Sequence, residues 1–560
     1  MTSLVELRVL EGPNLYFPRA AVKLTLDVAE LVEATPGRIR VLAGALGAGG
    51  VRPGEPGSGF RQRAVLRLVE RLVRRLAADA GTTRLGVRVR PTSDPHVVVV
   101  AFPWRHRNRA TALGEGVAAV LDAGLERVPG SVSEAAAAIL AVVPGPGPTT
   151  IRPRVPVIAV TGTNGKTTTS RMIAHVARTS GLHVGWSNTD GIYVDGELVE
   201  AGDYSGPSGA GRVLAHEVVE FAVTETARGG ILLKGIGVAY NDVSVVTNVT
   251  ADHLGLQGID TVDQLAEVKA VVPRITRKDG WAVLNADDPR VLAMRRTVRA
   301  RPWVFSRDPD SPALREVLGA GGRATTVIDG WLTVLRPGED PDPLVEVVDV
   351  PMTLAGLSAF NVENVLAAAS ATLAAGLSRE DVVAGLTGFL PDFEHNPGRM
   401  NTFTLGENTV VMDLAHNEAG LEALLQVLQG LRPPGSRVLL GLGAVGDRTD
   451  ELLTELGEIA AKGADTVVIG HKEHYLRGRT TEELDGLFRA GAANVGVDEV
   501  PSYPTELAAL QELLRIAGPG DVVGLMCHAE RAAVVDWLLA EGGTADDPAT
   551  LAAKVRRARG

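Results

Sequence analysis

Residues 157–177, VIAVTGTNGKTTTSRMIAHVA, place a glycine-rich turn between an apolar run and a helical pattern. Glycines allow backbone N–H groups to converge on phosphate oxygens, and a helix that begins directly after the turn adds a favourable dipole. Lys166 supplies a positive charge for the outer phosphates of a nucleotide, and Thr167 offers a hydroxyl group to Mg²⁺. Val160 stands where the longer form of this motif has its first glycine, so the turn is the shorter GTNGKT variant. The predicted ATP-binding residues of this turn are Gly162, Thr163, Asn164, Gly165, Lys166, Thr167 and Thr168, and a purely structural glycine turn is the alternative.

Two further side chains follow apolar runs, at positions where neighbouring strands are expected to end. Glu225 follows the run FAVT, and His253 comes shortly after VVTNV, beside Asp252. Taken alone, a glutamate at a strand end is more often a salt-bridge partner, and a lone histidine is usually packed in a core. Next to a nucleotide turn, however, a hard oxygen ligand and an imidazole suit a Mg²⁺ ion. We therefore predict that Thr167, Glu225 and His253 are metal ligands.

Composition shifts along the chain predict the elements that must position these residues. Residues 1–141 mix short apolar runs with helical patterns, which is typical of a compact α+β domain. Residues 142–156 are rich in proline and glycine and predict a linker. Residues 157–395 alternate apolar runs with helical segments, which predicts a central domain with a mostly parallel sheet, and residues 396–560 repeat this pattern in a smaller α/β, Rossmann-like domain. The predicted fold class is α/β.

A strongly basic helical pattern lies in the N-terminal domain, in RQRAVLRLVERLVRRLAADAG. Its apolar residues recur at helical spacing, and its arginines, which include Arg61, Arg67 and Arg71, fill the remaining positions. We interpret these arginines as a solvated helix face, and a site for an acidic substrate is the alternative.

Overall composition excludes several classes of function. The net charge of −11 over 560 residues argues against non-specific binding of nucleic acid. No uninterrupted apolar run of about 18 residues is present, so we expect no membrane span. The N-terminal residues MTSLVELRVLEGPN lack a basic region followed by an apolar core, so we expect no signal peptide. The single cysteine, Cys527, excludes an internal disulfide and fits a cytoplasmic location.

A series of short motifs resembles the Mur ligase superfamily over nearly everything after Pro156. These motifs are GTNGKTTT, ETARGGI, TNVTADHLGL, NADD, NVEN, NPGR, DLAHN and GDRTD, in that order. Within the superfamily, TDGIYVDG, GDYSGP, VKAVV and YLRGR look most like the Mur-like half of cyanophycin synthetases, and LRVLEGPN resembles their N-terminus. Those enzymes carry an ATP-grasp domain between their N-terminal domain and their Mur-like half. In this chain the N-terminal domain continues through the proline-rich linker directly into the Mur-like part. The resemblance therefore implies one of two ligase chemistries and suggests a separate ATP-grasp ligase as a partner.

The resemblance implies an ATP-dependent, ADP-forming ligase that activates a carboxylate as an acyl phosphate and joins an amino acid to it. In this comparison Asn285 and Asp288 border the adenine and ribose, while Arg399 and Asp413 close over the nucleotide. Lys166, Glu225, His253 and Lys269 are the implied catalytic residues. The resemblance also implies that Thr167 and Glu225 hold a first Mg²⁺ and that His253 holds a second, near the acceptor carboxylate. Lys269 aligns with a lysine that many Mur ligases carry as a carbamate, and a plain surface lysine is an equally open interpretation. The implied cofactors are ATP and Mg²⁺, with a carbamylated Lys269.

The substrates implied by the resemblance are an amino acid and a small peptide or amino-acid acceptor. Asp203 and Ser205 lie in the counterpart of an acceptor-binding loop, and Arg228 is predicted to hold a carboxylate, or else to form a structural ion pair. The implied substrate-binding residues of the last domain are His416, Asn417, Arg448, Glu473 and Arg477. Family analogy also suggests a homo-oligomer.

Three departures from the family pattern limit the comparison. Arg67 and Arg71 stand where some cyanophycin synthetases have the histidines of a zinc site, and arginine does not ligate zinc, so we predict no hydrolase site. Glu418 replaces the usual proline after DLAHN, and Phe360 replaces a histidine before NVEN. A non-catalytic nucleotide-binding subunit, acting as a scaffold for a peptide polymer, remains the second hypothesis.

Overall fold

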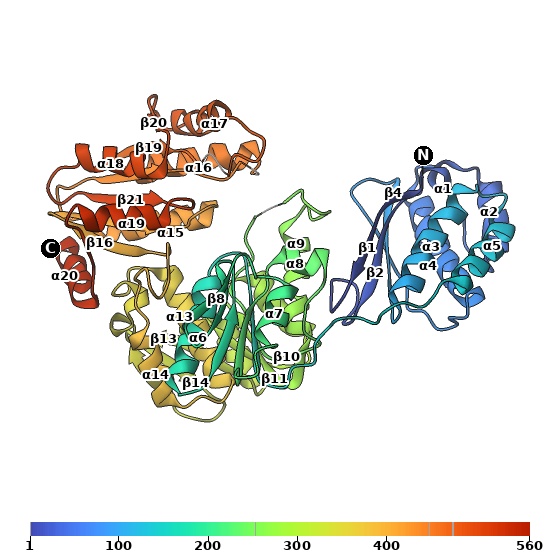
Figure 1. The fold of residues 1–560 in the computed structure, drawn as a ribbon, viewed down its shortest axis with the longest axis horizontal. Coiled ribbons are helices and arrows are strands. Elements are labelled where there is room, and N and C mark those ends of the chain that lie inside the picture. Colours follow the sequence, from blue (N-terminus) through green and yellow to red (C-terminus); the bar gives the residue numbers. More distant parts are fainter. Residues whose placement is uncertain (1, 253, 447, 473–474, 560) are drawn as a thin grey trace. The chain divides into compact units, whose positions relative to one another are not determined.

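A computed structural model describes residues 2–252, 254–446, 448–472 and 475–559 (Figure 1). The chain divides into two compact units. The first comprises the residues up to Ala159 together with Gly185–Asp242 and Gly255–Arg277. The second comprises Val160–Val184, Val243–Leu254 and the residues from Lys278 onward.

The N-terminal residues form a four-stranded antiparallel sheet with helices on one face, as Figure 1 shows. The strand order is β1-β2-β4-β3. The strands are β1 (Leu4–Leu10), β2 (Ala21–Asp27), β3 (Arg88–Pro91) and β4 (Val97–Pro103), and the helices are α1 (Ala29–Glu33), α2 (Pro36–Ala45), α3 (Gly59–Asp79), α4 (Arg107–Asp122) and α5 (Val128–Ala141). Alternating residues of the strands pack with the apolar stripes of the helices into one core. The predicted α+β domain is confirmed.

The helix α3 contradicts one of the sequence expectations. Its apolar stripe is buried as predicted, and Arg67 and Arg71 are exposed, but Arg61 is 0% exposed. The Arg61 guanidinium donates to five backbone carbonyls, those of Leu31, Val32, Ala34, Pro53 and Gly54. Helix ends leave carbonyl groups without intrahelical partners, and Arg61 satisfies those at the end of α1. The interpretation of Arg61 as a solvated residue was therefore wrong.

Residues 143–156 contain no helix and no strand, only the isolated bridge between Ile151 and Val238. This agrees with the linker composition. Within the first unit, Glu11 donates its backbone N–H to the Lys234 carbonyl at 2.7 Å, and Ile236 donates to Pro13 at 2.7 Å. The N-terminal sheet is thus tied through its β1–β2 connection to residues 234–236.

A second sheet has eleven strands in the order β15-β14-β13-β12-β11-β10-β5-β9-β6-β7-β8. β12 pairs in parallel with β11 and β13, whereas β13–β14, β14–β15, β6–β7 and β7–β8 are antiparallel. The strands are β5 (Val157–Thr161), β6 (Val184–Ser187), β7 (Gly191–Val194), β8 (Glu197–Ala201), β9 (Phe221–Glu225), β10 (Asn241–Val246), β11 (Thr276–Asn285), β12 (Arg301–Phe305), β13 (Arg323–Ile328), β14 (Trp331–Leu335) and β15 (Asp342–Glu346). The accompanying helices are α6 (Lys166–Thr179), α7 (Pro207–Val213), α8 (Arg228–Leu233), α9 (Val262–Lys269), α10 (Val271–Arg274), α11 (Pro289–Ala293), α12 (Pro312–Gly319), α13 (Ala359–Ala374) and α14 (Arg379–Gly388).

The third sheet, of seven strands, forms the C-terminal part in the order β20-β19-β18-β21-β17-β16-β22. Its interior pairs are parallel, and β16 pairs antiparallel with β17 and β22. The strands are β16 (Asn401–Leu405), β17 (Asn408–Asp413), β18 (Val438–Leu442), β19 (Thr466–Gly470), β20 (Ser502–Tyr503), β21 (Val522–Met526) and β22 (Thr544–Ala545), and the helices are α15 (Glu418–Leu431), α16 (Asp450–Gly463), α17 (Thr481–Ala493), α18 (Glu506–Ile516), α19 (Arg531–Ala540) and α20 (Pro548–Arg559). The predicted smaller α/β domain is confirmed.

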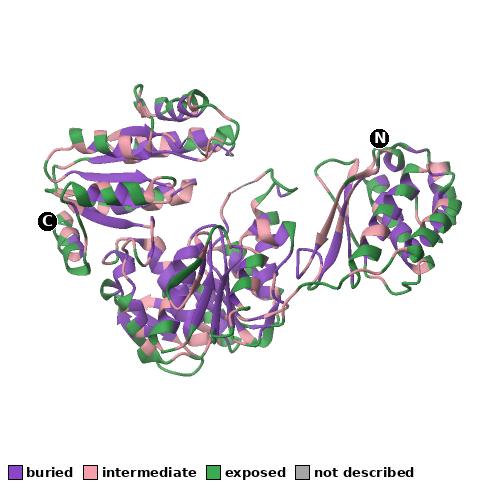
Figure 2. Cartoon of the chain, viewed as in Figure 1, coloured by how far each residue is buried: buried purple, intermediate pink, exposed green. Residues whose placement is uncertain are grey.

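Strand burial explains why the interior strands read as continuous apolar runs. Every residue of β5, β9, β18 and β21 is buried, as expected where helices cover both faces of a parallel sheet. In the C-terminal sheet, Val523 and Leu525 pack with α18 and α19, while Gly524 between them lies against Leu428 of α15. Figure 2 shows the buried residues concentrated in the sheets.

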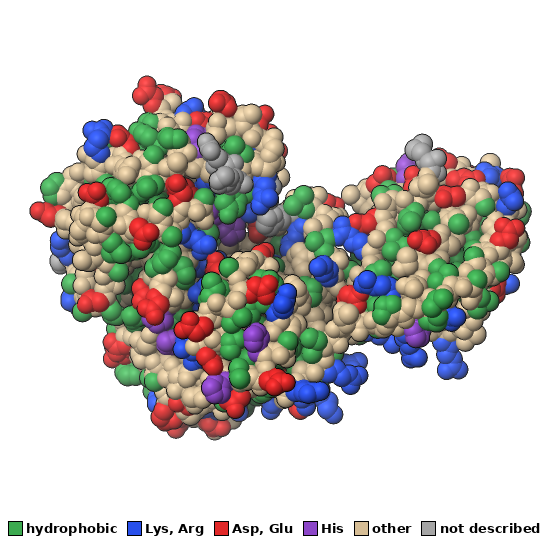
Figure 3. Space-filling view, viewed as in Figure 1, with side chains coloured by type: hydrophobic (Ala, Val, Ile, Leu, Met, Phe, Trp, Pro, Cys, Tyr) green, Lys and Arg blue, Asp and Glu red, His purple; other side chains and the backbone are tan. Residues whose placement is uncertain are grey.

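Charged side chains of both signs are interspersed over the visible surface (Figure 3). Across the described ranges, no helix has both the length and the apolar character needed to cross a membrane.

Candidate functional site

The glycine-rich turn, residues 162–165, is hydrogen-bonded to the segment Thr247–Thr250 that follows β10. The Asn164 backbone N–H donates to Asn248 Oδ1 at 2.8 Å, and Thr247 Oγ1 donates to the Asn164 carbonyl at 2.6 Å. The Thr163 N–H donates to the Asn248 carbonyl at 2.9 Å. Together these bonds fix the backbone of the turn directly before α6.

Two glycines of this turn have no room for a side chain. A Cβ at Gly162 would lie 1.9 Å from Thr247 Oγ1, and a Cβ at Gly165 would lie 2.2 Å from Asn364 Oδ1. Gly165 also has a φ of 82°, in the left-handed region that favours glycine. Gly165 is the N-cap of α6, so this conformation sets where the helix begins. Lys166 and Thr167 therefore fall in the first turn of α6, as the motif predicts.

The side chains of Lys166 and Thr167 have different partners. Lys166 Nζ donates to the Thr163 carbonyl at 2.7 Å, which folds the lysine over the turn. Thr167 is buried, and Arg399 donates from Nη2 to its Oγ1 at 3.3 Å. Nearby, Asn396 donates from Nδ2 to Thr168 Oγ1 at 3.2 Å. The predicted Arg399 therefore reaches the first turn of α6 from the NPGR segment.

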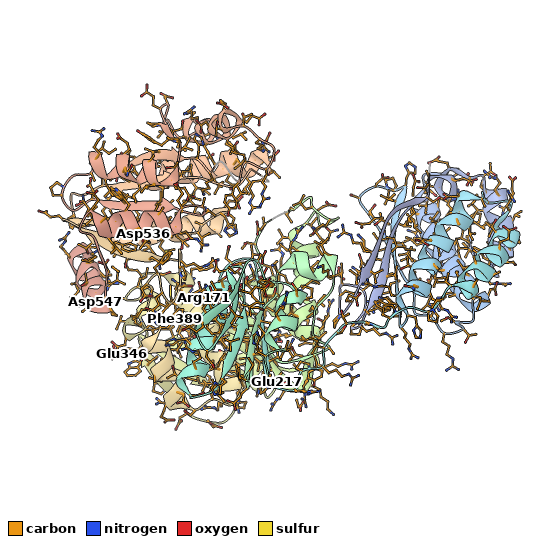
Figure 4. The ribbon with its side chains drawn as sticks, viewed as in Figure 1. Arg171, Glu217, Glu346, Phe389, Asp536 and Asp547 are labelled. Carbon is orange, nitrogen blue, oxygen red and sulfur yellow. The ribbon has the colours of Figure 1, made fainter. Side chains whose placement is uncertain are left out.

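Arg171, one turn further along α6, ties the helix to the residues that precede NPGR. Its Nη1 donates to the His395 carbonyl at 3.2 Å. Figure 4 labels Arg171 together with Phe389, which follows α14. The start of α6 is thus braced by the segment that leads into the C-terminal sheet.

Asn417 and His416 bring the C-terminal domain to the same turn. The Asn164 and Asn417 side-chain amides donate to each other, at 3.2 and 3.1 Å. His416 Nδ1 lies 3.0 Å from the Leu414 carbonyl, so this nitrogen carries the proton and donates. Burial lowers the pKa of His416 to about 4, so its ring is neutral at neutral pH. The structure thus joins Asn164, which the sequence assigned to the nucleotide, to Asn417, which it assigned to the substrate, and His416 precedes Asn417.

Asp413 ends β17 beside this group. The Met400 N–H donates to Asp413 Oδ2 at 2.9 Å. Burial raises the pKa of Asp413 to about 6, against the lowering effect of the Arg399 charge. The carboxylate is therefore ionised at neutral pH but costs free energy to keep so.

Asn285 and Asp288 are engaged with the protein backbone. Asn285 donates from Nδ2 to the Thr247 carbonyl at 2.8 Å and to Glu363 Oε2 at 3.1 Å. Asp288 is the N-cap of α11 and also accepts from the Val249 N–H at 2.6 Å. Both side chains therefore hold the Thr247–Thr250 segment in place, and their contact with adenine and ribose stays a prediction.

Glu225 and Lys269, in the first unit, are both buried. Glu225 ends β9 and is 1% exposed, and Lys269 ends α9 and is 3% exposed. Because Lys269 is buried, the alternative interpretation of a plain surface lysine was wrong. Buried lysines are rare without a specific role or partner. Its carbamylation stays a prediction.

The predicted acceptor residues also lie in the first unit. Ser205 is buried and donates from Oγ to Asp203 Oδ1 at 2.6 Å, within the loop before α7. Arg228 begins α8 and donates from Nη2 to the Leu256 carbonyl at 3.1 Å and to Gln257 Oε1 at 3.3 Å. These contacts order the loops, and substrate binding by the three residues stays a prediction.

Arg448 and Arg477 differ in environment. Arg448 is buried and lies 3.6 Å from Asp252 Oδ1, whereas Arg477 is exposed beside the Tyr475 ring. His253 and Glu473, predicted as a metal ligand and a substrate ligand, lie outside the described residues.

Sequence reasoning missed three residues that shape the turn, namely Thr247, Asn248 and Asn364. Their signals were present, because TNVT and NVEN stood among the matching motifs. A motif match alone did not show which amides point back at the loop.

A buried parallel strand, a glycine-rich turn with Lys and Thr, and a helix starting at the turn define a P-loop nucleotide-binding protein. Residues 160–372 match the Mur ligase middle domain, and residues 398–528 match the Mur ligase, glutamate ligase domain. The chain belongs to the Mur ligase superfamily.

The chain is 42% identical over 338 residues to the cyanophycin synthetase of Crocosphaera subtropica, covering 60% of this chain and 38% of that one. The chain thus spans about two fifths of the length of the cyanophycin synthetases that it matches. It is 30% identical over 328 residues to a UDP-N-acetylmuramoyl-L-alanyl-D-glutamate–2,6-diaminopimelate ligase of Geobacillus kaustophilus, covering 56% and 62% of the two chains. The structure of E. coli FolC in complex with DHPP and ADP has a TM-score of 0.50 at 18% identity, over 70% of this chain and 90% of that chain, and supports the fold alone.

Proposed function

We propose that the protein is an ATP-dependent, ADP-forming ligase that joins an amino acid to the carboxylate of a small peptide or amino-acid acceptor. The observation that carries this proposal is the arrival of Asn417 and Arg399, from the C-terminal part, at the P-loop and at Thr167. A nucleotide held by that loop would lie beside side chains of the domain that family members use for the incoming amino acid. Two relatives, a cyanophycin synthetase and a UDP-N-acetylmuramoyl-L-alanyl-D-glutamate–2,6-diaminopimelate ligase, support the same class of reaction.

The proposed reaction has two steps. The acceptor carboxylate oxygen attacks the γ-phosphorus of ATP, the bond to the ADP oxygen breaks, and an acyl phosphate forms. The amine of the amino acid then attacks the acyl carbon, the carbon–oxygen bond to phosphate breaks, and the amine gives up a proton. Phosphoryl transfer needs alignment and charge neutralisation, which the P-loop N–H groups and Lys166 supply. Closure by the C-terminal part would keep water from the acyl phosphate.

Thr167 and Glu225 would hold one Mg²⁺, and His253 would hold a second near the acceptor carboxylate. The hydroxyl of Thr167 and the buried carboxylate of Glu225 are hard oxygen donors, the kind that this ion prefers, so the donor set fits. When bound, Mg²⁺ supplies positive charge to the transferring phosphate. A carbamate on the buried Lys269 would add one more oxygen donor, and ¹³C NMR of protein kept in ¹³C-bicarbonate tests for it.

Family analogy extends the proposal to partners. A separate ATP-grasp ligase would supply the backbone of the acceptor, and the chain would act as a homo-oligomer.

The test incubates the purified protein with ATP, Mg²⁺, aspartyl and glutamyl acceptors including β-linked Asp-Arg peptides, and pooled amino acids. A new amide mass with equal release of phosphate is expected, and an ¹⁸O-labelled acceptor should pass one ¹⁸O to that phosphate. K166A should lower the rate at least about a hundredfold, because Lys166 is the P-loop cation. The matched control is K462A, since Lys462 is an exposed lysine paired only with Glu458 in the described structure.

Nucleotide binding without any amide product would contradict the ligase and favour the non-catalytic subunit. An inert K166A substitution in an active enzyme would equally contradict the proposed site.

A further inference from the structure

Three ionisable side chains form a buried network at the carboxyl edge of the C-terminal sheet. Lys472 follows β19, His528 follows β21, and Glu506 begins α18. Lys472 Nζ contacts His528 Nδ1 and lies 3.4 Å from Glu506 Oε1. The side chains of Lys472, Glu506 and His528 are 2%, 1% and 8% exposed. Neither the sequence motifs nor the proposed chemistry assigns them a role.

Glu506 fixes the backbone on which His528 sits. Its carboxylate accepts the N–H groups of His528, Ala529 and Glu530 at 2.7, 2.9 and 2.8 Å. It also accepts from Cys527 Sγ at 3.2 Å. A carboxylate that gathers three backbone donors holds the turn between β21 and α19 rigidly. The His528 ring therefore projects from a fixed point of the sheet edge.

The contact with Lys472 sets the tautomer of His528. Burial lowers the pKa of Lys472, and the adjacent Glu506 carboxylate opposes this by stabilising the ammonium form. An ammonium group only donates, so His528 Nδ1 accepts and Nε2 carries the proton. Burial, followed by the charge of Lys472, lowers the pKa of His528 well below its ordinary value, so the ring stays neutral. Within the described residues, His528 Nε2 has no hydrogen-bond partner. The network thus presents one oriented, buried N–H donor.

The groups around this donor favour a negatively charged ligand. Lys472, Arg399 and Arg531 all act on His528 as positive charges. Glu506 lies against Lys472, and Asp413 interacts with the charge of Arg399. The His416 ring lies edge-on to His528 at 6.4 Å, on the side of the site described above. A buried N–H among cations is a place where an anionic oxygen is stabilised.

The anions of the proposed reaction are the phosphate groups, the acceptor carboxylate and the carboxylate of the incoming amino acid. The acceptor carboxylate is assigned to the predicted acceptor residues of the first unit, among them Arg228. The P-loop and Lys166 already provide donors for phosphate, from the other sheet. His528 belongs to the carboxyl edge of the C-terminal sheet, where α/β domains bind their own ligand. This placement favours the carboxylate of the incoming amino acid.

We propose that His528 donates its Nε2–H to the α-carboxylate of the incoming amino acid, and that Lys472 is the positioning residue that fixes this tautomer. The proposal rests on the proposed ligase function and specifies how its second substrate is recognised.

Two substitutions at one position separate this role from a structural one. In H528Q the amide nitrogen replaces Nε2, whereas in H528N the amide replaces Nδ1 and keeps only the contact to Lys472. The proposal expects H528N to raise the KM for the amino acid about tenfold or more, with KM for ATP unchanged, and H528Q to restore most of the affinity. A structural role in holding Lys472 predicts the reverse order of the two variants. H471Q is the matched control, because His471 follows β19 at the same edge of the sheet and faces Asp485 instead of His528.

The carboxamide of the same amino acid identifies the recognised group. Wild type should prefer the acid to the carboxamide, and H528N should lose this preference. K472M should also raise the KM for the acid, because Nδ1 is then free to carry the proton in place of Nε2. An equal effect of H528N on acid and carboxamide, or an effect on KM for ATP alone, would overturn the proposal.

A binding experiment separates failure of this inference from failure of the ligase function. The protein carries ¹⁵N-labelled histidines and a non-hydrolysable ATP analogue, and the His528 Nε2 signal is assigned as the one that is missing in H528N. This signal should move on addition of arginine but not of argininamide. It should likewise move on addition of aspartate but not of its α-carboxamide. Such a shift in a protein that forms no amide would sustain the carboxylate site and reject the ligase. An active ligase whose His528 signal stays fixed and whose KM ignores H528N would reject the site alone.

Discussion

Asn164 in the P-loop and Asn417 at the start of α15 exchange two hydrogen bonds through their side-chain amides, at 3.2 and 3.1 Å. Both side chains are buried. Asn417 has a second duty as the N-cap of α15, where its Oδ1 accepts the Gly420 N–H at 2.9 Å. Asn417 therefore links the glycine-rich turn to α15, the helix that follows β17.

The two duties of Asn417 are separable by substitution. Serine caps a helix about as well as asparagine but is too short for the amide pair, so N417S should weaken nucleotide binding about fivefold and leave stability nearly unchanged. N417A loses both contacts, and its free energy of unfolding should fall by about a further 1 kcal/mol. Calorimetric titration with ATP and urea unfolding measure the two effects. Equal nucleotide affinity in N417S and wild type would show that the amide pair does not support the turn.

The P-loop glycine Gly165 offers a second prediction with a built-in control. G165A suffers the left-handed φ of 82° and a Cβ placed 2.2 Å from Asn364 Oδ1. Gly181 has a φ of 85° but nothing within 4 Å of its Cβ, so G181A carries the backbone strain alone, about 1–2 kcal/mol. G165A should lose measurable ATP binding, whereas G181A should only lower stability. The double variant G165A/N364A should recover part of the stability, and no recovery would mean that the contact with Asn364 is not the source of the damage.

The sequence predicted the features that depend on local pattern. The turn at Gly162–Gly165, the start of α6 and the three sheet-bearing parts follow from apolar periodicity and glycine chemistry, which act over a few residues. Arg61 was misjudged, and a surface position for Lys269 stayed open, because burial is a tertiary property. A helix pattern does not reveal that backbone carbonyls surround Arg61 or that the end of α9 is covered. Thr247 and Asn364 were missed for the same reason, since only the fold brings them to the glycines. The antiparallel strands β13–β15 are likewise set by pairing that no short window contains.

Glu418, which stands in place of the family's proline, should titrate near neutrality. Burial and a hydrogen bond with Glu455 raise its pKa to about 7. Because the pKa is raised on folding, its favourable contribution is full below its ordinary range and is lost as the pH rises through 7. E418Q should therefore match wild type in thermal stability at pH 5 and exceed it at pH 8. The exposed Glu407 provides the control E407Q, which should show no such crossover. If the thermal stabilities of E418Q and wild type changed in parallel with pH, Glu418 would not share a proton with Glu455.

Asp413 and Asp521 should respond to pH in opposite directions, because the fold shifts their pKa values in opposite senses. Burial raises the pKa of Asp413 from 3.8 to about 6. Its contribution to stability is therefore full below pH 3.8 and declines as the pH rises through 6, by roughly 3 kcal/mol at most for a shift of this size. For Asp521, burial acts to raise the pKa, but N–H donors from Arg437 and Gly518 and the Arg437 guanidinium outweigh it and hold the pKa low. Its contribution is present above its ordinary pKa and is lost as the pH falls.

Urea unfolding of D413N, D521N and wild type at pH 4 and pH 7 measures both signs. D413N keeps an acceptor for the Met400 N–H and removes the cost of ionisation, so it should gain stability relative to wild type between pH 4 and pH 7. D521N loses a buried ionised acceptor of four side-chain and backbone donors, so its deficit should be larger at pH 7 than at pH 4. If D413N showed the same pH trend as D521N, the Arg399 charge rather than burial would control Asp413. The Asp413 carboxylate would then be ionised at no cost in free energy, and its predicted contact with the nucleotide would need no compensation from ligand binding.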